Sequence, residues 1–249
     1  MKTIKTYISN LPKSIKVLLL INIIVNFIFI MCDYFFTYNL NYTFGAYPTC
    51  SENFKVFQIL TFMFSHDVNP LHIISNLVFL LLFATAVSRV IGDKNTIKLY
   101  IFSGLISFLS FNHEMNNQNS EISDKLTKEG IDVKKIKQER EGGYIEMSTF
   151  NNTNKKQKML LDLYPVTNSC LYGASGSIFA FMVIYPFFFI KRKKSILLNL
   201  IVLLHVIQLI IMVINHYIYT LSTTFGHLGG VIGGILFLIV WLVYLKNKK

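Results

Sequence analysis

The amino-acid sequence predicts an all-α membrane protein: a bundle of six transmembrane helices with the N- and C-termini in the cytosol. Three observations lead to this fold class, namely long apolar runs, positive charge on one side, and a few polar residues at a shared depth. Apolar residues make up 53% of the 249 residues. About 20 consecutive apolar residues, at about 1.5 Å of helix each, cross the hydrocarbon core of a bilayer.

The apolar runs predict the helices one by one. Five approach the required length, at residues 15–36, 71–91, 171–190, 195–214 and 225–245. A sixth, at residues 97–111, is shorter but can span the bilayer if it is tilted inside a bundle. The first run is too long for a signal peptide and has no small-residue cleavage site, so we expect it to remain as a helix.

The distribution of positive charge predicts the orientation of these helices. The net charge is +11, which by itself could indicate a nucleic-acid partner. Lysine and arginine instead concentrate in segments that the helices place on one side, at residues 2–16, 89–98, 191–194 and 246–249. Cytosolic loops of membrane proteins carry this excess. We therefore expect a multi-pass protein of the lipid bilayer that does not bind nucleic acid.

Two longer connections fall on the non-cytosolic side. Residues 37–70 contain the apolar stretch 54–64, which is too short to span and predicts an interfacial or re-entrant element. Residues 112–168 are rich in Asn, Lys, Glu and Ser, so we expect a mostly disordered insert with at most a weak helix within 123–139.

The chain is thereby divided into five parts. They are a cytosolic N-terminus (1–14), helices 1 to 3 with a long first loop (15–111), the polar insert (112–168), helices 4 to 6 (169–245) and a cytosolic tail (246–249).

Polar residues inside membrane helices often mark functional sites, and four of those in the predicted helices lie at a similar depth from one side. His72 and Asn76 fall in the first two turns of helix 2, counted from the non-cytosolic side. From the same side, Ser175 lies about 8 residues, or roughly 12 Å, into helix 4. His227 lies about 5 residues, or roughly 8 Å, into helix 6. Three helices thus present these side chains at a similar depth.

Together these residues have the chemistry of a serine hydrolase. A serine hydroxyl becomes a good nucleophile when an adjacent base takes its proton, and neutral histidine does this near pH 7. His72 and Asn76, four residues apart, share a helix face and can both donate hydrogen bonds to an oxyanion. No aspartate occurs at this depth, so we expect a dyad of Ser175 and His227. No Cys/His cluster has the spacing of a zinc site.

Each of these signals also has a purely structural interpretation. Serine beside glycine in a membrane helix is more often a packing feature, and a membrane histidine or asparagine often hydrogen-bonds a neighbouring helix. Gly173 and Gly176 beside the serine, and the glycines that follow Gly226, would suit any closely packed bundle. The catalytic interpretation depends on nucleophile, base and donors occurring together on three helices.

The motifs around these residues resemble those of the rhomboid intramembrane serine proteases, over residues 57–244 without the insert. Residues 173–180 (GASGSIFA) are similar to the GxSG nucleophile helix of that family. Residues 226–234 (GHLGGVIGG) are similar to its His-x-x-Gly-x-x-x-Gly helix, and residues 61–66 (TFMFSH) with His72 and Asn76 resemble its second-helix signature.

The resemblance implies a six-helix core whose water-accessible cavity opens to the non-cytosolic side. Ser175 would be the nucleophile and His227 the base, with an oxyanion site formed by His72, Asn76 and the N–H of Ser175. Phe179 takes the aromatic position that stacks on the histidine. The residues expected to support the site are Phe179, His66, Gly173 and Gly176.

The substrates that the resemblance implies are single-pass membrane proteins, cleaved in or near a transmembrane helix without a metal or organic cofactor. The alternative is a proteolytically inactive relative that binds or escorts membrane clients. Such relatives typically lack the serine or the histidine, and this chain has both.

The chain also departs from the family pattern. Phe57 and Gln58 replace a frequent Trp-Arg pair, Ser88 replaces a usual acidic residue, and His66 and His72 are one residue further apart. The insert at 112–168 replaces a much shorter connection and could cover the active site.

Overall fold

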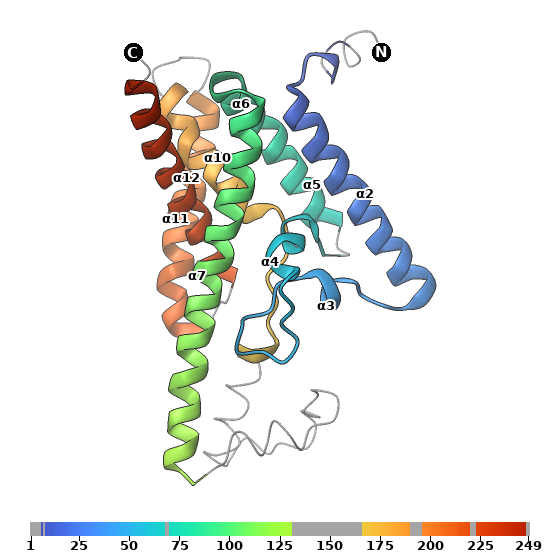
Figure 1. Ribbon diagram of the computed structural model, residues 1–249, viewed down its shortest axis with the longest axis vertical. Helices are drawn as coiled ribbons and strands as arrows, with labels where there is room; N and C mark the ends of the chain where they lie inside the picture. The colour runs from blue at the N-terminus through green and yellow to red at the C-terminus, as the bar shows by residue number, and fades with distance from the viewer. Residues whose placement is uncertain are drawn as a thin grey trace.

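The computed structural model describes residues 6, 8–67, 70–130, 166–189, 196–219 and 223–247. Its long helices run side by side, and the start of the first and the end of the last lie at the same end of the bundle (Figure 1). The described residues form no strand, and their β-type pairing is an isolated antiparallel bridge between Ala46 and Leu171. The predicted all-α class is therefore confirmed for the described residues.

Each of the six predicted apolar runs contributes to a helix. The long elements are α2 (Lys13–Phe36), α5 (Pro70–Phe79), α6 (Thr85–Ile91), α7 (Asp93–Lys128), α10 (Ser175–Phe189), α11 (Ile196–Tyr219) and α12 (Thr223–Lys246). A π-helical turn, η2 (Leu80–Ala84), joins α5 to α6. The stretch predicted to be interfacial forms two short pieces, α4 (Gln58–Thr61) and the 3-10 helix η1 (Phe62–Phe64), preceded by α3 (Asn41–Phe44).

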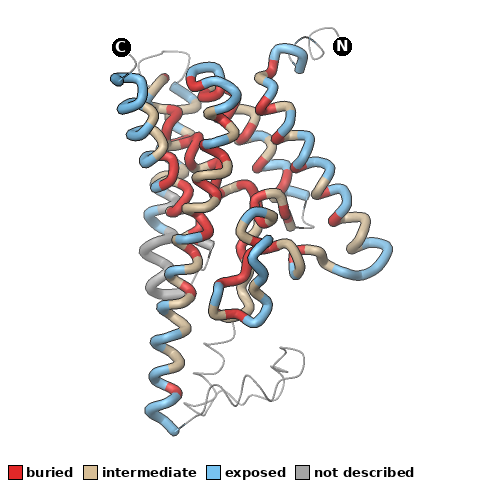
Figure 2. Tube along the Cα trace, viewed as in Figure 1, coloured by how far each residue is buried: buried red, intermediate tan, exposed pale blue. Residues whose placement is uncertain are grey.

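The outer surface of the bundle is apolar. Among the described residues, three helical segments are long and apolar enough to cross a bilayer, namely Lys13–Phe36, Pro70–Ile91 and Thr224–Lys246. Shorter apolar segments occur at Ser175–Phe189 and Ile196–Ile207. Large apolar side chains such as Leu20 and Phe27 of α2 are exposed, and Figure 2 shows that buried residues concentrate between the helices. Apolar surface on this scale marks an integral membrane protein.

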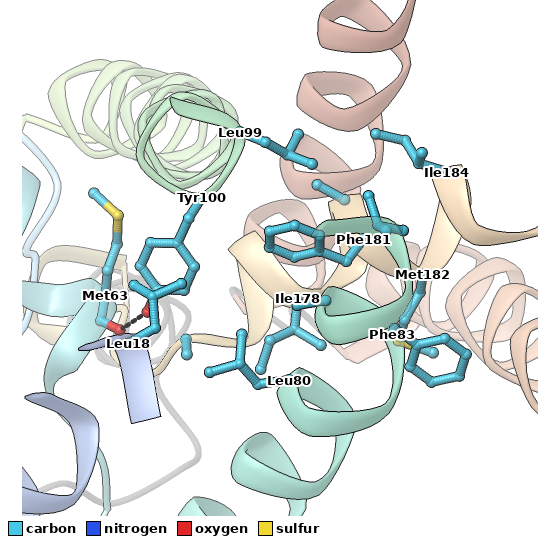
Figure 3. Close-up of a cluster of buried hydrophobic side chains, with 14 of the residues drawn as sticks. Leu18, Met63, Leu80, Phe83, Leu99, Tyr100, Ile178, Phe181, Met182 and Ile184 are labelled. Atoms are coloured by element: carbon cyan, nitrogen blue, oxygen red, sulfur yellow. Dashed lines mark hydrogen bonds between the residues drawn. The ribbon is translucent and has the colours of Figure 1, made fainter. Parts of the chain in front are cut away.

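The buried core lies where α2, η1, η2, α7 and α10 meet. Figure 3 shows Tyr100 of α7 and Phe181 of α10 among aliphatic side chains from the neighbouring elements. The hydroxyl of the fully buried Tyr100 donates a hydrogen bond to the Met63 carbonyl at 2.9 Å. A buried phenol needs such an acceptor, and this bond ties the end of the first loop to the centre of α7.

Helix α7 is much longer than the apolar run that predicts it, and residues 112–128 are helical where we expected a disordered insert. Asn112 and Asn116, one turn apart, provide the reason. Their side-chain oxygens accept hydrogen bonds from the backbone N–H of Thr49 at 2.7 Å and of Cys50 at 3.1 Å. The polar side chains of this helical segment therefore hold the first loop in place by hydrogen bonds. Residues 131–165 of the predicted insert lie outside the described residues.

Helix α10 begins at Ser175, four residues later than predicted. Gly173 has a φ of 108°, a backbone conformation that favours glycine and cannot continue a helix. Just before it, Leu171 exchanges two backbone hydrogen bonds of 2.8 Å with Ala46 of the first loop. The prediction that Ser175 lies about two turns inside a helix was wrong, because the Leu171–Ala46 pairing and the backbone of Gly173 keep residues 171–174 out of the helix.

Glycines let α12 pack closely against both α7 and α10. A methyl group added at Gly230 would overlap the carbonyl of Gly176, and one added at Gly229 would lie 2.7 Å from Ser107 Cα. The hydroxyl of Ser107 donates to the Gly226 carbonyl at 2.6 Å. Small residues thus bring the three helices together at the level of Ser175, as is common in membrane bundles.

Ser88 takes part in a polar contact between α2, α6 and α7. The Ser14 hydroxyl lies 3.1 Å from the Ser88 hydroxyl and donates to the Asp93 carboxylate at 2.6 Å. The Ser14 N–H donates to the same carboxylate at 2.8 Å. Asp93 therefore supplies a negative charge near the start of α2, where the helix dipole favours it.

Replacing Gly230 by alanine should destabilise the bundle, because the methyl group overlaps the backbone of α10. We expect a loss of about 1–3 kcal/mol, seen as a fall of about 3–10 °C in the thermal midpoint of the detergent-solubilised protein. Ile232→Ala, at an exposed position of the same helix, is the control and should change the midpoint little. Equal midpoints for Gly230→Ala and the unchanged protein would contradict this packing.

Candidate active site

The hydroxyl of Ser175 and the ring of His227 meet between α10 and α12. Ser175 Oγ lies 2.9 Å from His227 Nε2, within hydrogen-bond distance. The His227 ring stacks on Phe179, one turn after Ser175, with a centroid distance of 4.7 Å and an interplanar angle of 25°. The structure thus brings together the predicted nucleophile, base and aromatic residue.

The second ring nitrogen of His227, Nδ1, lacks the carboxylate partner that a catalytic triad would provide. Nδ1 is buried, and no described residue accepts a hydrogen bond from it. If Nε2 accepts the serine proton, Nδ1 must carry the other ring proton. A carboxylate normally orients that N–H in a triad. Here stacking on Phe179 orients the ring instead.

His72 and Asn76 of α5 lie against the segment that precedes Ser175. A methyl group at Gly173 would lie 3.0 Å from His72 Nε2 and 3.8 Å from Asn76 Nδ2. Only glycine leaves this space open for both side chains. The two predicted oxyanion donors therefore converge on residues 171–174, the segment that precedes the predicted nucleophile Ser175.

Backbone contacts orient both of these side chains as donors. The Asp67 N–H donates to His72 Nδ1 at 3.3 Å, which leaves the ring proton on Nε2. Asn76 Nδ2 donates one of its two hydrogens to the His72 carbonyl at 2.9 Å. Helix α10 adds the N–H groups of its first turn, including that of Ser175, which have no partner within the helix. This arrangement suits an anionic oxygen.

These side chains line one cavity of about 250 Å³. Its lining consists of His72, Ser75, Asn76, Phe79, Ser175, Ile178, Phe179, Met182, His205 and His227. His205 and Phe79 had not been predicted to belong to the site. Their rings meet edge to face at 4.8 Å, and His205 Nδ1 lies 2.8 Å from the Ile201 carbonyl of its own helix. Neither residue belongs to a sequence motif, so only the packing of α5 against α11 could place them here.

His66 does not line the cavity but supports the nucleophile segment. Its Nε2 accepts a hydrogen bond from the Ala174 N–H at 3.4 Å, and its Nδ1 lies 3.2 Å from the Phe64 carbonyl. Its ring is also 5.4 Å from that of His72, despite the extra residue between them. Burial, together with the nearby His72, lowers the pKa of His66 to about 4. The neutral ring that the Ala174 contact requires is therefore the stable form.

The first loop holds the rest of the segment from residue 171 to residue 174. The Gly173 N–H donates to the Phe62 carbonyl at 2.9 Å, and the Tyr172 hydroxyl donates to Asp67 Oδ2 at 3.4 Å. Burial and the Asp67 carboxylate raise the pKa of Tyr172 to about 12, so its hydroxyl keeps its proton. The segment that precedes Ser175 is thus positioned by a loop more than 100 residues away in sequence.

Metal binding finds no support in the described part of the chain, where no three His, Cys, Asp or Glu side chains cluster as ligands.

Acid should destabilise the protein through His66. Its folded pKa is about 4, below the ordinary 6.5, so the unfolded chain binds more protons and stability falls as the pH drops from about 6.5 to 4. The full effect corresponds to about 3 kcal/mol. His66→Gln, which does not titrate, should show a smaller decrease in thermal midpoint over this range than the unchanged protein. Parallel pH profiles for the two proteins would refute this role.

Comparison with protein families gives a match that covers most of the chain. The Rhomboid domain family matches residues 53–122 and 143–244, a range that contains Ser175, His227, His72 and Asn76. The comparisons with curated proteins and with solved structures gave no match. The match and the apolar helices together establish that this chain is an integral membrane protein of the rhomboid family.

Proposed function

We propose that the protein is a serine endopeptidase that cleaves transmembrane-helix substrates with a dyad of Ser175 and His227. The observation that carries this proposal is the 2.9 Å contact between Ser175 Oγ and His227 Nε2. The rhomboid family acts on membrane proteins within the bilayer, so single-pass membrane proteins are the substrates we expect.

The first chemical step is attack on the scissile carbonyl. Ser175 Oγ forms a bond to the carbonyl carbon while its proton passes to His227 Nε2, and the carbonyl π electrons move to the oxygen. Stacking on Phe179 keeps the imidazole aligned as its charge develops. The contact distance already lies in the range that general-base catalysis requires.

The oxygen that becomes negative is stabilised by donors from two helices. The N–H of Ser175 lies at the positive end of α10, and the Nε2–H of His72 and an N–H of Asn76 approach from α5. Donors that are already oriented need no reorganisation during the reaction.

The intermediate then collapses to products. The C–N bond breaks as His227 gives its proton to the leaving amine, which leaves an acyl ester on Ser175. A water molecule, deprotonated by His227, attacks this ester and releases the carboxylic acid and the free serine. His227 passes the proton taken from water to Ser175 Oγ as the ester C–O bond breaks, so the protons balance over the two halves of the reaction.

The alternative function is that of a proteolytically inactive rhomboid protein that binds or escorts membrane clients. A binding role needs neither the Ser175–His227 contact nor donors directed at the same point. The presence of both favours the protease.

We further propose that the chain crosses the membrane six times, with both termini in the cytosol. Helices α2, α5–α6, α7, α10, α11 and α12 would be the spans, and the basic segments at their cytosolic ends follow the positive-inside rule. The cavity would then open to the non-cytosolic side, next to the first loop and the insert at 112–168.

Ser175→Ala and His227→Ala should each reduce cleavage of a model single-pass substrate by at least about 10³-fold, because each removes one half of the dyad. The measurement is the rate of product formation in proteoliposomes. Ser177→Ala is a matched control, because the Ser177 hydroxyl donates to the Tyr100 carbonyl on α7 and does not line the cavity. Cleavage that persists in the Ser175 variant would exclude the dyad.

A fluorophosphonate probe separates the protease from the inactive binder. Labelling of the unchanged protein that disappears in both dyad variants supports an activated serine. A folded protein that the probe does not label would support the binding function instead.

Asn76→Ala and His72→Ala should each lower kcat by about 10²- to 10³-fold with little change in KM, since the donors act mainly on the transition state. Ile74→Ala, at an exposed position between them on α5, is the control for helix packing. An unchanged kcat in both variants would show that these residues do not form the oxyanion site.

A further inference from the structure

A second cavity lies at the other end of α12 from His227. It is a groove of about 460 Å³ between the first turns of α7 and the last turns of α12. Its lining consists of Lys94, Asn95, Lys98, Phe237, Val240, Trp241 and Tyr244. Its volume is within the range of small-molecule sites. It shares no residue with the active-site cavity.

The groove opens where the close packing of α7 and α12 ends. A methyl group added at Gly233 would lie 2.8 Å from Ser103 Cα, so the two backbones are in contact there. One and two turns later, α12 carries Phe237 and Trp241 in place of glycine, and their size prevents the same approach. Trp241 lines the groove, and its ring is held there by edge-on packing against Phe188 of α10 at 5.7 Å.

The rim of the groove on α7 is positively charged. Lys94 and Lys98 are one turn apart and both exposed, and neither forms an ion pair with a described residue. The nearest acidic residue along the chain, Asp93, accepts its hydrogen bonds from Ser14 and therefore faces α2. The start of α7 adds the partial positive charge of a helix N-terminus. Two positive charges thus lie beside the groove without an ion-pair partner among the described residues.

The walls of the groove on α12 are apolar and open to the surroundings. Val240 is 68% exposed and Tyr244 is 52% exposed, and Figure 2 shows that the end of α12 is largely exposed. Tryptophan and tyrosine near the end of a membrane helix are typical of the headgroup region. Lysine side chains extend toward the same region. The groove therefore joins a cationic rim to an apolar wall at the depth of the lipid headgroups.

We propose that this groove binds an anionic phospholipid. The ammonium groups of Lys94 and Lys98, with the amide of Asn95, would contact the phosphate. An acyl chain would lie along Phe237, Val240 and Trp241. Basic pockets between membrane helices are known to suit anionic headgroups.

Other occupants fit the groove less well. A zwitterionic lipid has no net charge to match the two lysines. A second copy of this chain would bring the same positive rim against this one, at a cost that low dielectric increases.

Fluorescence of Trp241, the one tryptophan of the chain, can measure this binding directly. The full-length protein is reconstituted in phosphatidylcholine, and phosphatidylglycerol with brominated acyl chains, which quench tryptophan, is added in increasing amounts. The reverse titration uses brominated phosphatidylcholine in phosphatidylglycerol. We expect the anionic lipid to bind next to Trp241 roughly 10- to 30-fold more strongly, at about fivefold per lysine.

Variants of the two lysines test the assignment. Lys94→Gln and Lys98→Gln should each lower the preference about fivefold, and together they should abolish it. Lys94→Arg with Lys98→Arg should keep it. The control is Lys125→Gln with Lys128→Gln at the far end of α7, which removes the same amount of charge. This variant should leave the preference for the anionic lipid unchanged. Unaltered quenching by brominated phosphatidylcholine in the Gln variants verifies that the groove is intact.

Several results would overturn the proposal. One is equal quenching of Trp241 by both lipids in the unchanged protein. Another is a preference for the anionic lipid that persists in the double Gln variant. A third is that neither lipid quenches Trp241 because another copy of the chain covers it. Glycerol 1-phosphate at matched ionic strength should not reduce the quenching by the anionic lipid. A reduction would indicate a site for soluble phosphate compounds instead.

Discussion

The contact between the backbones of Gly176 and Gly230 sets the distance between α10 and α12, and the candidate active site depends on it. A methyl group at Gly230 would overlap the backbone of Gly176, so these helices lie closer than ordinary side chains allow. Ser175 precedes one of them and His227 precedes the other by three residues. In lipid, where no hydrophobic force drives helices together, such close packing is a main source of association.

A second set of contacts, between the first loop and residues 171–174, determines the position of the segment that precedes Ser175. The first loop pairs with Leu171, accepts the N–H of Gly173 and supplies His66 as an acceptor for Ala174. The loop is itself held by Asn112 and Asn116 of the long helix α7. The direction of the Ser175 hydroxyl and of the first N–H groups of α10 therefore depends on polar contacts outside the apolar core. This explains why α7 remains helical where its sequence becomes polar.

The two ends of α12 have different chemistry. At its start, glycines bring α7 and α10 close, and the cavity next to His227 is lined by side chains of α5, α10, α11 and α12. At its end, aromatic residues separate it from α7, and the groove is bordered by Lys94 and Lys98, which form no ion pair with a described residue. The first end suits the proposed reaction with a membrane-protein substrate. The second suits a lipid of the opposite leaflet, if the six spans run as proposed.

The sequence by itself determined the all-α membrane class, because uninterrupted apolar runs can only be satisfied as helices in lipid. Its motifs, with their glycines, also identified the rhomboid family and the residues that meet in the cavity. The tertiary structure decided where α10 begins, how far α7 extends, and that His205 and Phe79 reach the cavity. Residues 171–174 are kept out of α10 by the pairing of Leu171 with Ala46, and Asn112 is kept helical by contact with Thr49. Such long-range hydrogen bonds override the local preference for helix or loop, and they cannot be predicted from patterns along the sequence.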